Sequence, residues 1–400
     1  MKRKIYAAAA AVVLLIASCG NKIFLPRMSE ISRLEIVQIM GIDLVDGEAV
    51  VTLILNRGGS AGEDGWSGDT MGGIASLTAP TVFEAISKMN VYSDRRLHLG
   101  YVDYLIIGEE TARGDITKCL DFLTRFNETR YTINIFLAKD ATAKDFLTQI
   151  SSESRSTVDM FANIEETIVE MNNTRMLTLI ELLIALGTPQ TATVIPALIL
   201  EDADFVTLAG AKMPEKAFTP AGFGIIKERR LVGYYDTELT SAYNDLTGHV
   251  NELPVGVTGP NDSVVAMQVA SEELVFEPKW DGDALKGIRY RVLIGATITE
   301  QNGHSDIIND DSLRKLEKQT AELAKTEFER VIQKAQEVGQ DSLGAGDRLR
   351  MKNPLKWEKI SESWGEIFSE LDITVEGECR MHRSHDMRES VEDAESNGNE

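Results

Sequence analysis

Cys19 has the clearest chemical role of any residue in this sequence. It follows Ile16, Ala17 and Ser18, a large aliphatic residue and two small ones, at the end of an apolar segment. That order of side-chain sizes is typical of a bacterial lipoprotein signal, in which the thiol receives a diacylglycerol and cleavage then leaves the acylated cysteine first. A secretory signal with an incidental cysteine is the alternative, but position, order and size all favour lipidation. We therefore predict that Cys19 is the lipidation site.

The segment before Cys19 has the features of an export signal. Residues 2–4 are basic, and the apolar stretch 5–17 is too short to cross roughly 30 Å of hydrocarbon comfortably. We expect residues 1–18 to be removed, which leaves the protein attached to the outer face of a membrane by its lipid. Two or three acyl chains hold a domain firmly, because each buried methylene contributes about 0.8 kcal/mol.

The other two cysteines are expected to be small buried hydrophobic residues. Cys119 has apolar neighbours at helical spacing, and Cys379 occupies the inward phase of an alternating strand pattern. Their segments are distant in the sequence, and we expect no disulfide between them.

The remaining motifs do not indicate a cofactor, a metal or a catalytic residue. His382 and His385 form the only close pair among five histidines, without a third ligand or a glutamate base at zincin spacing. The glycines of residues 58–73 lack the Lys-Ser or Lys-Thr of a phosphate loop, and residues 65–68 lack the frame of a nucleophile elbow. A catalytic pair of carboxylates stays open, because acidic residues are plentiful and no spacing singles out one pair.

Composition limits the partners and the number of domains. The chain has 400 residues, of which 43% are hydrophobic and 26% are charged, a balance typical of folded proteins. Its formal charge of -22 makes nucleic acid a poor partner, because phosphate binding needs a basic surface. This length exceeds one compact core, so two or three domains are expected.

The first half of the chain alternates between strand and helix patterns. Strands are predicted at 34–42, 50–55, 101–107, 132–138 and 193–200, with a turn at Asp46-Gly47 between the first two. Helices are predicted at 80–89, 116–126, 143–150, 161–171 and 178–186, and a mobile loop at 58–73. This alternation indicates an α/β or α+β domain.

The second half is dominated by hairpins and one long helix. A β-hairpin is predicted at 222–234 and a helix at 239–247, followed by a break rich in Pro, Gly and Asn at 254–262. Extended segments at 264–269 and 273–276 and an alternating strand at 288–298 lead into a helix that starts at Asp310 and ends at Gly339. A shorter helix at 357–368 and a strand at 372–381 complete the pattern.

Together these patterns predict a mixed α/β and α+β fold of three domains, in which helices pack on mixed sheets. The last domain should carry its long helix on an antiparallel-rich sheet. We divide the chain into a signal (1–18), an anchor and spacer (19–33), an N-terminal α/β domain (34–190), a middle domain with a β-hairpin (191–258), a C-terminal α/β domain (259–383) and an acidic disordered tail (384–400).

The order of these segments resembles the Ger(x)C spore germination lipoproteins, the C subunits of germinant receptors, over nearly the whole mature chain. The resemblance is carried by Met40-Gly41-Ile42-Asp43, residues 81–86, His98-Leu99-Gly100, residues 105–109, the 222–234 hairpin, residues 341–346 and residues 364–368. The chain departs from the family pattern just after Cys19, where Gly20-Asn21-Lys22 replaces the usual Trp-Asp opening, and in the 58–73 loop.

The resemblance implies three α/β domains, a lipid anchor and a non-enzymatic role beside membrane-embedded A and B subunits. Family members act at the inner membrane of the spore, where germinants such as amino acids or sugars trigger the release of ions and dipicolinate. No catalytic residue is carried over. Whether this subunit binds the germinant itself stays open.

Two other functions remain as alternatives. A lipid-anchored solute-binding protein would pass a small molecule to a membrane partner, and a deep cleft between domains would favour it. An anchored hydrolase would need a clustered nucleophile and base, or a metal.

Overall fold

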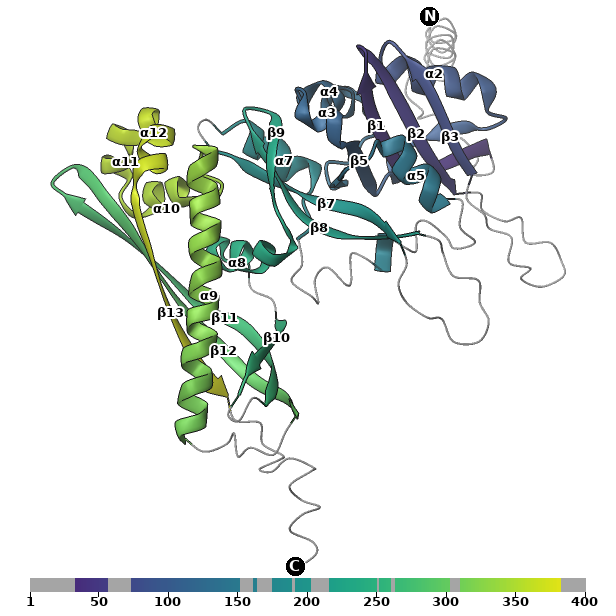
Figure 1. The fold of residues 1–400 in the computed structure, drawn as a ribbon. Helices are drawn as coiled ribbons and strands as arrows, with labels where there is room; N and C mark the ends of the chain where they lie inside the picture. Colours follow the sequence, from purple (N-terminus) through teal and green to yellow (C-terminus); the bar gives the residue numbers. More distant parts are fainter. Residues whose placement is uncertain are drawn as a thin grey trace, which may run out of the picture.

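The computed structural model describes residues 33–56, 73–151, 161–163, 175–188, 191–202, 216–249, 252–259, 263–302 and 310–382. Within these residues the strands form two mixed sheets covered by helices (Figure 1). The predicted mixed α/β class is confirmed. The long helix α9, Asp310–Val338, lies on the second, antiparallel-rich sheet as expected.

The first sheet follows the order β3-β2-β1-β5-β6-β7-β8-β9, with the short β4 paired to β1. Its strands are β1 (Leu34–Val45), β2 (Glu48–Asn56), β3 (Gly73–Ala79), β4 (Arg96–His98), β5 (Tyr104–Gly108), β6 (Asn134–Ala138), β7 (Thr193–Asp202), β8 (Lys216–Lys227) and β9 (Arg230–Tyr235). The strands from β1 through β5 and β6 to β7 are parallel, and the outer pairs are antiparallel. The predicted turn between the first two strands, β1 and β2, and the predicted hairpin at 222–234, β8–β9, are confirmed.

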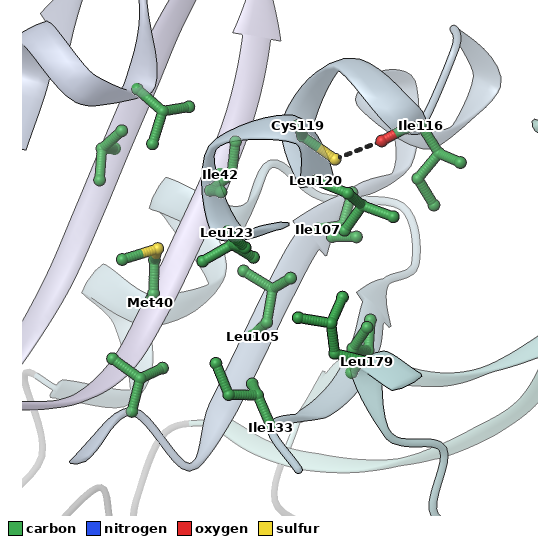
Figure 2. Packing of buried hydrophobic residues seen from close by; sticks show 14 of the residues in the cluster. Met40, Ile42, Leu105, Ile107, Ile116, Cys119, Leu120, Leu123, Ile133 and Leu179 are labelled. Carbon is green, nitrogen blue, oxygen red and sulfur yellow. Dashed lines mark hydrogen bonds between the residues drawn. The ribbon is translucent and has the colours of Figure 1, made fainter. Parts of the chain in front are cut away.

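The central strands are apolar on both faces because helices cover both faces. In β5, Leu105 and Ile107 face one core, whereas Tyr104 and Ile106 face another. The first core is covered by α2 (Val82–Tyr92), α3 (Glu109–Arg113), α4 (Thr117–Arg125) and α7 (Leu179–Leu186). Figure 2 shows its packing around Cys119 and Leu120. The opposite core contains α5 (Ala143–Ser151).

Side-chain caps fix where two of these helices begin. The Thr178 hydroxyl accepts a hydrogen bond from the Glu181 backbone N–H, and the Glu181 carboxylate accepts in return from the Thr178 N–H. The Thr81 hydroxyl caps α2 by accepting a hydrogen bond from the Glu84 N–H. Such caps satisfy backbone donors that have no partner inside the helix.

The second sheet has the order β10-β11-β12-β13. Its strands are β10 (Leu253–Thr258), β11 (Val264–Asp281), β12 (Ala284–Asn302) and β13 (Asp372–His382). The first two pairings are antiparallel and β12–β13 is parallel. Apolar residues of α9, including Phe328, Val331 and Ala335, are buried against this sheet. The chain from α9 to β13 forms α10 (Ala345–Lys352), α11 (Pro354–Ile360) and α12 (Trp364–Glu370).

One hydrophobic core joins the two sheets. Val194 of β7 and Phe223 of β8 share this core with Tyr290 of β12 and Phe328 of α9. Helix α8, Thr237–Thr247, lies at this junction and contributes several apolar side chains. The first sheet includes strands from both the predicted N-terminal and middle domains, and the division into three domains stays a prediction.

Several details differ from the sequence prediction. The segment predicted as a break at 254–262 begins with β10, an edge strand of the second sheet. Its residues alternate between half-buried and exposed, which suits a strand at the edge of a sheet. The helix predicted at 357–368 is split into α11 and α12, and α10 was not predicted. Cys379 is half-buried rather than buried. The 58–73 loop and most of the 161–171 helix lie outside the described residues.

The turn of the β8–β9 hairpin predicts a stabilising substitution. Glu228 and Arg229 have φ of 48° and 67°, the left-handed conformation that a two-residue hairpin turn demands and that glycine adopts most easily. Arg229→Gly should therefore raise the free energy of unfolding by about 1 kcal/mol. Chemical denaturation measures this change.

Arg230→Gly is the matched control, because Arg230 begins strand β9 with ordinary extended backbone and an exposed side chain. It should lower stability, since glycine weakens a strand. Equal effects of the two substitutions would contradict the strain argument.

Candidate functional site

The predicted lipidation site, Cys19, lies outside the described residues, which begin at Arg33. The predicted signal and the acidic tail also lie outside them. The lipidation of Cys19 therefore stays a prediction. The candidate sites among the described residues are the family motifs and two concave surfaces.

The carboxylate of Asp43 holds the N-terminus of α5 against the first sheet. Its two oxygens accept hydrogen bonds from the backbone N–H groups of Ala143 (2.8 Å) and Lys144 (2.9 Å). Burial raises the Asp43 pKa, and these hydrogen bonds oppose the rise. A Cβ at Gly108 would overlap the Asp43 carboxylate, so only glycine fits there. Asp43 and Gly108, which belong to two of the family motifs, therefore have a structural role.

Glu109, which follows Gly108, likewise accepts a hydrogen bond from the backbone of another segment. Its carboxylate accepts a hydrogen bond from the Asp140 backbone N–H at 2.7 Å and pairs with Arg113. Burial raises the Glu109 pKa, but these hydrogen bonds outweigh it and the net pKa is lowered. The group is an ionised structural acceptor rather than a general acid.

Glu128 fastens the segment that contains the His98-Leu99-Gly100 motif. It lies 3.2 Å from His98 Nδ1, pairs with Arg96 at 2.8 Å and accepts from the Leu99 N–H. The His98 ring packs edge-on against Tyr101. These contacts fix the loop between β4 and β5.

Asp341 is fully buried and joins the last two motifs. Its carboxylate accepts from the Leu343 N–H at 3.0 Å, the Gly346 N–H at 2.6 Å and the Trp364 indole N–H at 3.1 Å. Burial raises the Asp341 pKa, and the hydrogen bonds oppose this effect. Its backbone carbonyl accepts from Ala192 N–H, so the same residue also contacts the first sheet.

Neither described cysteine is an activated nucleophile. Burial raises the pKa of the Cys119 thiol to about 12, and its Sγ donates to the Ile116 carbonyl (Figure 2). Burial also raises the pKa of Cys379 to about 11. Both thiols are protonated at neutral pH, whereas nucleophilic attack needs a thiolate.

The larger of the two concave surfaces is a groove between α2 and α4 with a volume of about 710 Å³. Phe83, Phe122 and Phe126 line it; the first two ring centroids are 6.3 Å apart, and the Phe122 and Phe126 rings stack at 5.0 Å. At the rim, Arg125 Nε lies 3.0 Å from both carboxylate oxygens of Asp121. The groove thus offers an aromatic surface for apolar contact.

The smaller surface is a cavity of about 310 Å³ between α8, α9 and the second sheet. Helix α8 contributes Glu238 and Asp245 to its lining, and α9 contributes Glu327. Ser271 of β11 also lines it. These residues were not singled out from the sequence. A weak signal existed, because Asp245 lies beside the Leu239, Ala242 and Leu246 stripe of its helix.

In the described part of the chain, no group of three or more His, Cys, Asp or Glu side chains is arranged to hold a metal ion. None of the described helices combines the length and apolar character needed to cross a membrane.

Two family models match the chain in succession. The model described as "Spore germination protein N-terminal domain" matches residues 27–200, and that described as "Spore germination B3/GerAC like, C-terminal" matches residues 221–385. Spore germination protein KC from Bacillus subtilis (strain 168) is 24% identical over 392 residues, which cover 93% of each chain.

A solved structure supports the same fold. The crystal structure of the GerBC protein matches with a TM-score of 0.50 and 16% sequence identity, over 86% of this chain and 96% of that one. At this identity the match bears on the fold alone.

The hydrogen bonds of Asp341 predict a large effect of a small substitution. Asp341→Asn keeps the shape but turns one acceptor oxygen into a donor, which then faces N–H groups. The free energy of unfolding should fall by about 2–4 kcal/mol. Chemical denaturation would measure it.

Asp347→Asn, the same change at an exposed site of α10, is the control. It should change stability by no more than about 0.5 kcal/mol. A similar loss for both variants would show that the buried network is not the cause.

Proposed function

This chain belongs to the Ger(x)C family of spore germination proteins, and from that membership we propose that it is the lipid-anchored C subunit of a spore germinant receptor. The observation that carries the proposal is the match of an N-terminal and a C-terminal germination model in succession, over residues 27–200 and 221–385. A relative that aligns over 93% of both chains supports it, because that relative is itself a spore germination protein.

The proposed attachment rests on the sequence around Cys19. The thiol receives the lipid, the signal (1–18) is removed, and residues 19–33 separate the bilayer from strand β1. The subunit then stands on the outer face of the inner spore membrane. There it contacts the A and B membrane subunits, which places its folded part beside proteins that cross the bilayer.

The proposed role is non-enzymatic. The motif residues Asp43, Glu109 and Asp341 are engaged in hydrogen bonds to backbone groups of the protein itself. This supports a subunit whose contribution is a defined shape and surface. The subunit would stabilise one conformation of the receptor complex, or pass a conformational change between its subunits, without converting a substrate.

A lipid-anchored solute-binding protein is the second candidate. The cavity between α8, α9 and the second sheet favours it, because its volume of about 310 Å³ is at the lower end of the range for small-molecule sites. The partners recovered from the membrane distinguish the two functions.

Removal of the lipid acceptor tests the attachment. Cys19→Ala should move most of the protein from the spore membrane fraction to the soluble fraction and impair germination, because acyl chains supply the hydrophobic contact with the bilayer. Membrane fractionation with immunoblotting measures the distribution, and incorporation of an alkyne-tagged fatty acid measures lipidation. Cys379→Ala, at a half-buried thiol, is the control and should stay in the membrane fraction. Unchanged attachment of the Cys19 variant would refute the anchor.

Membrane co-purification tests the receptor assignment. The tagged full-length protein, solubilised from spores in mild detergent, should recover two proteins with several membrane-spanning segments. Mass spectrometry identifies them, and an unrelated tagged lipoprotein of the same membrane provides the background. Recovery of a transporter, or of the tagged protein alone, would favour the solute-binding candidate.

A further inference from the structure

The cavity between α8 and α9 has an unusual distribution of polar groups. Its charged lining residues are all acidic: Glu238 and Asp245 from α8, and Glu327 from α9. The strands β10, β11 and β12 contribute only uncharged lining residues. The cavity is therefore negative on its helical side and neutral on its sheet side.

Three residues that line this cavity have a buried side-chain oxygen with no hydrogen-bond partner among the described residues. The three atoms are Oδ1 of Asp245, Oγ of Ser271 and Oγ1 of Thr320, and the two hydroxyl residues are only 4% and 3% exposed. A buried polar atom without a partner costs free energy, because it has lost its hydrogen bonds to water. The Asp245 carboxylate can only accept when it is ionised, and a hydroxyl can accept as well as donate. These atoms therefore fit a ligand that donates hydrogen bonds.

The charges of the cavity call for a cation. Burial, aided by the nearby Glu327 carboxylate, raises the pKa of Asp245 to about 7. Burial likewise raises the pKa of Glu327. Glu238 is already paired with Arg330, at 3.4 Å. Asp245 and Glu327 therefore repel each other when both are ionised, and a positive group between them would relieve the repulsion.

Most of the remaining lining residues are apolar. Ile294 of β12 and Leu323 and Phe328 of α9 line the cavity beside the acidic groups. Such a wall gives a short hydrocarbon chain a place to lose its contact with water. The occupant should thus combine one cationic donor with a small apolar part.

We propose that this cavity binds a small primary ammonium compound, whose ammonium group donates hydrogen bonds to Asp245 and Ser271 while its hydrocarbon part contacts the apolar wall. This ligand site goes beyond the subunit role and does not depend on it. The rival explanation is a pair of buried acids that binds only protons.

The test uses the full chain in detergent and n-butylammonium as the probe. Thermal unfolding is followed at pH 8 with increasing n-butylammonium chloride at constant ionic strength, with NaCl as the balancing salt. n-Butanol is the uncharged control of equal length, and CaCl2 and MgCl2 are tested separately. A ligand that binds only the folded state raises the melting temperature in a saturable way.

We expect n-butylammonium to raise the melting temperature in a saturable way, and n-butanol and the divalent salts to leave it unchanged. Asp245→Asn should weaken the apparent affinity about tenfold or more, because hydrogen bonds to a charged group are the stronger kind. Ser271→Ala should weaken it about threefold, as expected for one neutral hydrogen bond. Asp347→Asn, an exposed site on α10, should leave it unchanged.

Calorimetry on the unsubstituted protein gives a second readout that needs no variant. Since the ammonium group favours ionised Asp245, binding below pH 7 must displace its proton. Titrations in two buffers of different ionisation enthalpy should show about one proton released per ligand at pH 6 and almost none at pH 8.5.

Several results would overturn the proposal. These are equal stabilisation by n-butanol, stabilisation by a divalent cation instead of the amine, binding without proton release at pH 6, or an unchanged affinity in a folded Asp245→Asn variant. The absence of any saturable effect would leave the cavity as a proton-binding pair only. Asp245→Asn should itself fold, because it removes a buried charge that lies near another carboxylate.

Discussion

The buried carboxylate of Asp341 organises the segment after α9, and the backbone of the same residue joins that segment to the first sheet. One residue accepts hydrogen bonds from the turn before α10, from the Trp364 indole and, through its backbone carbonyl, from Ala192 next to β7. A carboxylate without such donors is costly to bury, so these groups must stay together whenever the protein is folded. The backbone hydrogen bond to Ala192 holds this ordered segment beside the start of β7.

The position of α8 follows from this junction. The hydroxyl groups of Tyr235 and Tyr243 both lie 2.8 Å from oxygens of Ser342, the residue after Asp341. These bonds bring β9 and α8 to the same turn, and the shared apolar core packs α8 between the first sheet and α9. The cavity lined by Asp245 and Glu327 is thus a consequence of how the two sheets meet, and its shape depends on the junction.

The elements that sequence analysis predicted well are those with a strong local pattern. The alternating 288–298 segment and the helix from Asp310 to Gly339 carry their periodicity and end signals in their own residues. By contrast, β10 contains Pro254 and Gly256, and its strand conformation comes from pairing with β11. The sequence indicated at most that Asp245 lies beside an apolar stripe, and the meeting of the cavity's carboxylates was not predictable for a similar reason. These carboxylates belong to helices far apart in the chain, and nothing local indicates that they meet.

The protonation of Asp245 couples this cavity to the stability of the junction. Its folded-state pKa of about 7 lies above the usual carboxyl value, so the folded state binds its proton more tightly than the unfolded state does. The stability that this proton contributes is complete at low pH and is lost as pH rises from the usual carboxyl range through about 7. A cation that takes the place of the proton restores that stability at neutral pH by the same linkage. Ala242 and Leu246 of α8 belong to the core shared by both sheets, so the helix that carries Asp245 also packs at the junction.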